Sequence, residues 1–109
     1  MEKEKIILAA ELISKLNNLV DILFYKEYFD FIDSAKAYVD NIYDFIYTIP
    51  TLTRKRTKNK KHGAFYCSYK PNRNTTWYIT FDAEDDVYLI KNITNNHSKN
   101  YPRFIAGIK

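Results

Sequence analysis

Glycine and cysteine are scarce in this chain, and each shortage excludes a class of protein. Its 109 residues contain two Gly and one Cys. Gly63 and Gly107 stand too far apart to form the glycine-rich loop that cradles phosphates, so P-loop, kinase and Rossmann proteins are excluded. Cys67 has no second cysteine with which to form an internal disulfide or a multi-cysteine zinc site. The two His add too few ligands for a convincing metal site, and we therefore expect no metal and no cofactor.

Long apolar runs are also missing. After the charged start, the first apolar run ends at Ala10, before Glu11. It is too short for the hydrophobic core of a signal peptide or for a membrane span. We therefore expect a cytoplasmic protein that has no membrane partner.

Aromatic side chains, by contrast, are abundant. The chain has ten Tyr, seven Phe and one Trp, and hydrophobic residues of all kinds make up 46% of it. Aromatic rings bury more area than aliphatic side chains do, so they should supply most of the core volume. A chain of this length forms one small domain, and we expect residues 1–109 to fold as a single unit.

Charge is distributed unevenly along the chain. Residues 1–50 contain five Lys and nine acidic residues, whereas residues 51–109 contain twelve Lys or Arg and four acidic residues. The first half therefore carries a net charge of −4 and the second half +8, which gives the +4 of the whole chain. A basic face of this kind is typical of phosphate binding, because phosphate contacts supply most non-specific affinity for nucleic acids. The competing interpretation is a solvated Lys-rich loop.

The first part of the chain has the periodicity of a helix. From Lys3 to about Lys26, apolar residues recur every three or four positions, and neither Gly nor Pro interrupts them. An alternative stays open here, because Asn17 and Asn18 could end this helix early and leave residues 19–25 as a strand.

A second helix is predicted downstream. Asp33 or Ser34 offers a side-chain cap for its start, and an apolar stripe predicts that the helix runs to about Thr48. Pro50 ends it, because proline cannot donate a backbone hydrogen bond and disfavours helix in the residue before it. Two helices with a short connection should pack as an antiparallel hairpin over residues 1–50.

The remaining sequence predicts a sheet. A basic linker, residues 51–62, precedes three strand-like runs at residues 64–69, 77–81 and 87–93, which turn-forming residues separate. Residues 63–109 should therefore form an antiparallel meander and a C-terminal loop. We expect an α+β domain in which the N-terminal helical hairpin packs on one face of a three- to four-stranded antiparallel sheet and leaves the other face open.

Alternation within the strands separates two faces. Phe65, Cys67 and Tyr69 share one face, which we expect to be buried, and Cys67 is then a small core residue and not a reactive thiol. Tyr66 falls on the other face, where its ring is a candidate platform for an unpaired base. The acidic cluster at residues 82–86 lacks the glycine and ligand spacing of a calcium loop, so we interpret it as a solvated turn.

The two histidines are the candidate proton-transfer groups. His97 follows the last predicted strand, where side chains point into solvent or a cleft, and histidine near neutral pH can donate or accept a proton. His62 stands beside Lys60 and Lys61, and neighbouring positive charge disfavours its protonated form. The competing interpretation for each is an ordinary surface histidine.

The order of elements and several short motifs resemble the RelE/ParE superfamily of bacterial toxins. The resemblance covers about residues 30–105 and includes "GAFYCSY", "TTWYITFD", "VYLIKNI" and "NNHSKNY". It implies a toxin of a toxin–antitoxin pair, with a cognate antitoxin protein as partner. Members that cut messenger RNA on the ribosome carry basic residues on the sheet face and a His or Tyr after the final strand. The implied activity is a metal-independent endoribonuclease that inhibits translation.

The resemblance also implies roles for particular residues. His97 is the expected general acid, Lys61 or His62 the base, and Arg73, together with Arg54 or Arg56, the group that stabilises the charged phosphorane. The expected RNA-binding residues are Arg54, Lys55, Arg56, Lys58, Lys60 and Tyr101.

Three departures from the superfamily leave a second class of function open. The run at residues 77–81 has no Arg or Lys, residues 51–61 contain no Glu to act as base, and no strand is predicted before the helices. A non-enzymatic protein fits these departures, either a ParE-like gyrase inhibitor or a small basic nucleic-acid-binding protein. A third hypothesis is an α+β domain whose cations serve only solubility.

Overall fold

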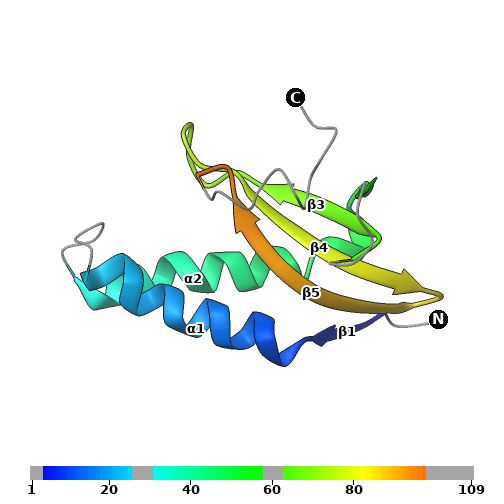
Figure 1. The fold of residues 1–109 in the computed structure, drawn as a ribbon, viewed down its shortest axis with the longest axis horizontal. Coiled ribbons are helices and arrows are strands. Elements are labelled where there is room, and N and C mark those ends of the chain that lie inside the picture. Colours follow the sequence, from blue (N-terminus) through cyan, green and yellow to red (C-terminus); the bar gives the residue numbers. More distant parts are fainter. Residues whose placement is uncertain (1–3, 26–30, 58–62, 98–109) are drawn as a thin grey trace.

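The structure is a computed structural model that describes residues 4–25, 31–57 and 63–97. In these ranges the chain forms two α-helices, a 3₁₀ turn and a sheet, which confirms the α+β class (Figure 1). The elements are β1 (Lys5–Leu8), α1 (Ala10–Tyr25), α2 (Ile32–Ile46), η1 (Ile49–Thr51), β2 (Lys55–Arg56), β3 (Phe65–Tyr69), β4 (Trp77–Glu84) and β5 (Val87–Asn95).

The sheet has five described strands in the order β1-β5-β4-β3-β2. The meander β3-β4-β5 is antiparallel as predicted, and β2 adds an antiparallel edge. Strand β1 pairs with β5 in parallel, so the sheet is mixed, with more strands than the three or four expected. The helical hairpin supplies part of the long crossover that a parallel pair requires.

The prediction that the first helix starts at Lys3 is wrong. Residues 5–8 form β1, in which exposed and partly buried side chains alternate, and the helix begins at Ala10. Ile6 and Ile7 are β-branched and suit a strand, but four residues are too few for periodicity to separate a strand from a helical turn. The pairing partner of this run lies about eighty residues away in β5, beyond the reach of any local pattern.

The proposed break at Asn17 and Asn18 is also wrong. Helix α1 continues through both residues to Tyr25, and Leu12 and Leu16 are fully buried on its inner face. Burying two leucines outweighs the low helix propensity of asparagine, which costs well under about 1 kcal/mol per residue. In the described ranges no helix is both long and apolar enough to span a membrane.

Helix α2 starts without the predicted side-chain cap. Phe31 occupies the N-cap position, and no side chain bonds to the first turn there. Asp33 lies inside that turn, where a carboxylate interacts favourably with the positive end of the helix dipole. The helix ends at Ile46, two residues before Thr48.

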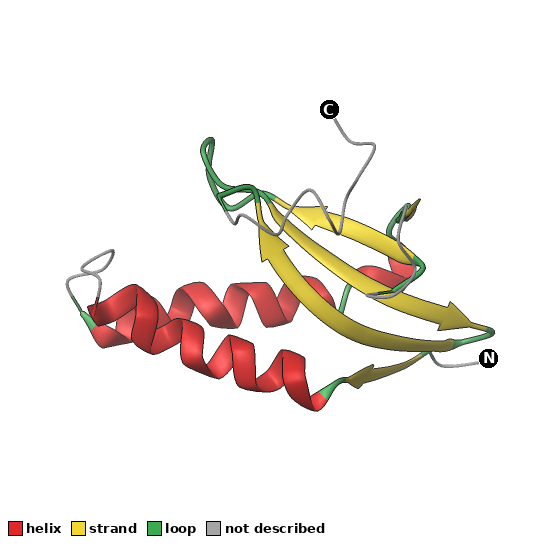
Figure 2. Cartoon of the chain, viewed as in Figure 1, coloured by secondary structure: helices red, strands yellow, loops and turns green. Residues whose placement is uncertain are grey.

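Both helices cover the same face of the sheet, and the core lies between the two layers (Figure 2). Strand register places Phe65 beside Phe81, Cys67 beside Ile79, and Tyr69 beside Trp77. This confirms the predicted buried face. The core cluster consists of Leu12, Leu16, Val39, Ile42, Ile46, Ile49, Cys67, Trp77, Ile79, Phe81, Ile90 and Ile93.

In β3, the alternation pattern predicted the burial of Cys67 correctly but not that of Tyr66. Cys67 is 5% exposed, and burial raises the pKa of its thiol to about 11, although the nearby Arg54 acts in the opposite direction. It is a core residue, as expected. Tyr66 is only 4% exposed although it points to the face away from the helices, so its ring does not offer the stacking surface that the sequence suggested.

Candidate functional site

Two loops are joined at the end of the sheet where β3 and β5 finish and β4 begins (Figure 1). The side chain of Asn96, just after β5, makes the junction. Its amide nitrogen donates to the Asn74 carbonyl at 3.1 Å, and its Oδ1 accepts from the Thr76 backbone N–H at 3.0 Å. The Asn96 backbone N–H donates to the Thr76 carbonyl at 3.1 Å. Three hydrogen bonds therefore fix the loop after β5 against the β3–β4 connection.

His97 is the next residue after this junction and is exposed. Its Nε2 lies 3.3 Å from the Thr75 hydroxyl, and its backbone N–H donates to Asn95 Oδ1 at 2.9 Å. The hydroxyl can donate to or accept from the ring, because the role of Nε2 depends on the tautomer. Within the described part of the chain no carboxylate contacts the imidazole, so the hydroxyl is its polar side-chain neighbour.

Arg73 lies in the β3–β4 connection, in a turn that an asparagine stabilises. Asn72 Oδ1 accepts from the backbone N–H groups of Asn74 and Thr75, both at 2.9 Å, which is the geometry of an Asx turn. Arg73 is exposed between these bonded residues. The structure therefore brings the loops of two predicted site residues, Arg73 and His97, to the same end of the sheet.

The other predicted site cations in the described ranges lie elsewhere. Arg54 and Arg56 place their guanidinium carbons 4.4 Å and 5.4 Å from the centre of the Phe65 ring. Lys55 pairs with Tyr66 in the sheet, so it projects to the opposite face from the two arginines. All three side chains are exposed. Residues 55 and 56 of the basic segment have therefore joined the sheet as an edge strand.

This placement separates Arg54, Lys55 and Arg56 from His97. Strand β2 pairs with the start of β3 at Phe65, whereas the His97 loop lies beyond the far end of β3 at Tyr69. Four residues of strand span about 13 Å, and β2 and β5 are three strands apart, which adds about 14 Å across the sheet. The expected convergence of Arg54, Lys55 and Arg56 with His97 is not found among the described residues.

Five predicted site residues lie outside the described ranges, and their roles stay predictions: Lys58, Lys60, Lys61, His62 and Tyr101.

The prediction from sequence also missed three residues that shape the His97 end, namely Asn74, Thr75 and Asn96. Their only local signal is the density of Asn and Thr around two turns, and this composition does not reveal that the turns contact each other. Over the described ranges no three His, Cys, Asp or Glu side chains are placed to hold a metal ion.

Comparisons with known proteins do not assign this chain to a family. No protein-family model matches it, and no curated protein or solved structure gives a match.

Proposed function

We propose that this protein is a RelE-like toxin that cleaves messenger RNA without a metal ion. The observation that carries the proposal is the junction made by Asn96, which fixes exposed His97 beside the Arg73 turn. Strand β1 gives further support, because a strand before the helices is what the superfamily has and what the sequence did not predict. One of the three departures from the superfamily is thereby removed.

The chemistry requires an acid, a base and a cation. A ribose 2′-hydroxyl attacks the adjacent phosphate, the bond to the 5′ oxygen breaks, and that oxygen must receive a proton as it leaves. Protonated His97 supplies this proton, and its contact with the Thr75 hydroxyl orients the ring. Arg73 offsets the negative charge that develops on the phosphorane. The base remains Lys61 or His62, as the sequence predicts.

The partners follow from this function. A toxin of this class acts on mRNA, in some members on the ribosome, and a cognate antitoxin protein keeps it inactive. Such an antitoxin would cover the basic surface with an acidic or amphipathic segment.

Growth inhibition tests the proposal in cells. Induced expression of the wild-type chain should stop bacterial growth, and His97→Ala should restore it, because removing a general acid lowers the rate about 100-fold or more. Lys36→Ala, at an exposed position on α2, is the matched control and should inhibit growth like the wild type. Equal inhibition by His97→Ala, at equal expression and with the circular dichroism of the folded protein, would rule out this role for His97.

The position of the basic edge favours a second candidate function. Arg54, Lys55 and Arg56 form an exposed cationic cluster remote from His97, and a binding protein needs such a cluster but no particular histidine. We propose, as the alternative, a small nucleic-acid-binding protein or a ParE-like gyrase inhibitor. Replacing all three residues by Gln should then abolish the activity, whereas His97→Ala should leave it unchanged. For RNA, loss of three phosphate contacts should reduce the slope of log K against log salt by about two.

A further inference from the structure

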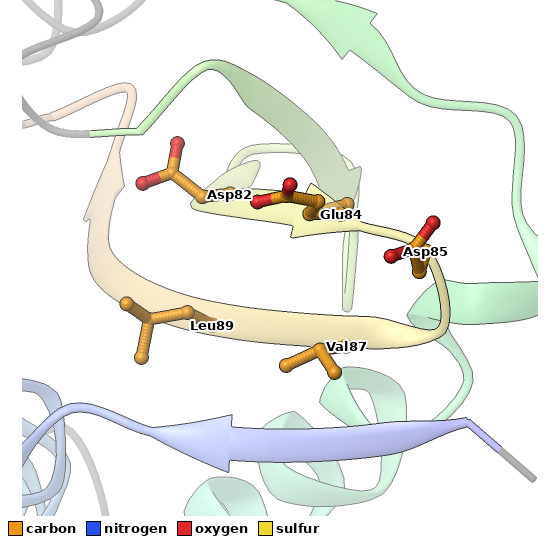
Figure 3. Close-up of a pocket in the computed structure, with 6 residues that line it drawn as sticks. Asp82, Glu84, Asp85, Val87 and Leu89 are labelled. Carbon is orange, nitrogen blue, oxygen red and sulfur yellow. The ribbon is translucent and has the colours of Figure 1, made fainter.

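The end of the sheet opposite His97 carries a surface hollow. It lies at the tight turn between β4 and β5, has a volume of about 530 Å³ and is shown in Figure 3. Residue Val87 starts β5 and Asn95 ends it, so about 26 Å of strand separates this turn from the His97 loop. The hollow is lined by Asp82, Ala83, Glu84, Asp85, Val87 and Leu89.

Aliphatic side chains form one part of this surface. Ile7 is 40% exposed and Val87 is 41% exposed, whereas Ile79, Ile90 and Ile93 of the same sheet are buried. In the register of β1 and β5, Ile7 pairs with Leu89, and Val87 lies two residues before Leu89 on the same face of β5. The three side chains therefore lie together on the face of the sheet away from the helices. Clusters of exposed apolar side chains on a small domain are typical of interaction sites.

Carboxylates form the other part, on a chain that is basic overall. Asp82 is already engaged, since it accepts from the Ala64 backbone N–H at 2.8 Å and lies 3.4 Å from the Lys91 amine. In the described ranges no cation pairs with Glu84, Asp85 or Asp86. Besides Lys91, register places Lys5 on this face, beside Val87, and Lys55 on the same face but at the far edge, on β2. Four acids against two lysines give the β1–β5–β4 side of this end a net negative charge, while Arg54, Lys55 and Arg56 lie at the other edge of the sheet, around β2.

Strand β1 supplies an open backbone edge next to this surface. It is the outermost strand, and no described strand pairs with its far side. The N–H groups of Lys5 and Ala9 donate to Asp86 and Ile90 carbonyls at 2.7 Å and 2.9 Å. Because successive residues of a strand alternate in direction, the N–H and C=O groups of Ile6 and Leu8 point outward, away from β5. An unpaired edge of this kind is a template for an added strand.

We propose that this end of the molecule binds an extended segment of a partner protein that adds to β1 as a sixth strand. Apolar residues at alternate positions of that segment cover Ile7, Val87 and Leu89. A Lys or Arg on the same face of the segment reaches the carboxylates of Asp85 and Asp86, which form the turn. Backbone hydrogen bonds supply affinity in this mode of recognition, and side-chain contacts supply specificity. The inference does not depend on the proposed RNA cleavage, since His97 lies at the other end of β5.

Peptide selection on the intact protein tests this surface. Random ten-residue peptides displayed on phage should yield binders with alternating apolar residues and at least one Lys or Arg. Synthetic copies of these peptides should bind Asp85→Asn/Asp86→Asn about fivefold more weakly, because exposed ion pairs contribute modestly. Asparagine tolerates the positive φ of 56° at Asp85, so the variant should keep its turn. The matched control, Asp21→Asn/Asp40→Asn, changes two exposed carboxylates on the helices and should bind like the wild type.

Amide hydrogen exchange distinguishes strand addition to β1 from peptide binding that forms no backbone hydrogen bonds with β1. Saturating peptide should slow the exchange of the Ile6 and Leu8 amides about tenfold or more, with little change at Lys5 and Ala9, which already donate to β5. The inference is overturned if no peptide is enriched, or if enriched peptides bind equally well to Asp85→Asn/Asp86→Asn. It is also overturned if protection appears elsewhere, or if Ile6 and Leu8 become protected with protein concentration alone, which would mean that a second copy of this chain covers the edge.

Discussion

Trp77 is the residue where the sheet and the second helix are joined by a hydrogen bond. Its indole N–H donates to the Tyr38 hydroxyl on α2 at 2.9 Å, and the indole is 7% exposed. The bond gives a buried donor an acceptor, and it fixes the orientation of α2 relative to β4. Sequence alternation could predict that Trp77 is buried, but the partner of its N–H lies 39 residues away and has no local signal.

Removing the acceptor should destabilise the domain. Tyr38→Phe leaves the Trp77 N–H buried without its partner, which costs about 1–3 kcal/mol. Chemical denaturation followed by tryptophan fluorescence measures this free energy of unfolding. Tyr25→Phe is the control, because Tyr25 is 74% exposed and the same loss of a hydroxyl should change stability by less than about 0.5 kcal/mol. Equal stability of the two variants would show that the bond is unimportant.

The thiol of Cys67 should be unreactive while the protein is folded. Its pKa of about 11 leaves about one molecule in a thousand as thiolate at pH 8, against about one in ten at the reference value of 9.0. Burial also blocks access. Labelling with Ellman's reagent should therefore be at least about 100-fold slower in buffer than in guanidinium chloride. Fast labelling of the folded protein would contradict the burial of Cys67.

The same pKa shift affects stability at high pH. Because the pKa in the folded chain is higher than the reference value of 9.0, the thiol contributes stability that is present below pH 9 and is lost as the pH rises towards 11. Burial also raises the pKa values of Tyr43 and Tyr69, and these act in the same direction, whereas the lowered pKa of Lys15 acts in the opposite one. Cys67→Ala should reduce the fall in unfolding free energy between pH 9 and 11.

At the scale of elements, the edges of the sheet were the hardest parts to predict. The three central strands each have five or more residues, so alternation located them, although β4 and β5 extend beyond the predicted ends. Strand β1 has only four residues and pairs with β5, about eighty residues away, and β2 has only two residues, too few for alternation to show a strand. Beyond the end of β1, the side chain of Lys15 on α1 bonds to β5. Its amine donates to the Ile93 carbonyl and to Asn92 Oδ1, both at 2.9 Å.

Gly63 connects the basic segment to β3 and should not tolerate a side chain. Its φ is +129°, and a Cβ atom there would lie 2.7 Å from the backbone nitrogen of Phe81. Gly63→Ala should therefore cost about 2 kcal/mol or more and lower the midpoint of thermal unfolding by about 10 °C. Ser68→Ala, at an exposed position on β3, is the control. A Gly63→Ala protein as stable as this control would contradict the close approach of the two strands.

At the scale of the whole molecule, the two ends of the sheet have different chemistry. One end joins the loops of Arg73 and His97, and the other presents the acidic turn beside the open edge of β1 and the cations of β2 at the opposite edge. The sequence predicted the α+β class, the helical hairpin and the exposed position of His97. It could not predict which loops meet, because Asn96 and Asn74 are 22 residues apart and their contact depends on the register of β4 and β5.

Cleavage of RNA in a cell-free translation reaction tests the central claim most directly, because ribosomes are then present if the activity needs them. Wild-type protein should cut a labelled mRNA and leave 2′,3′-cyclic phosphate ends, since the nucleophile is the neighbouring 2′-hydroxyl. His97→Ala should cut at least about 100-fold more slowly, and Lys36→Ala at the wild-type rate. No cleavage by the wild type, or equal cleavage by His97→Ala and wild type, would contradict the claim.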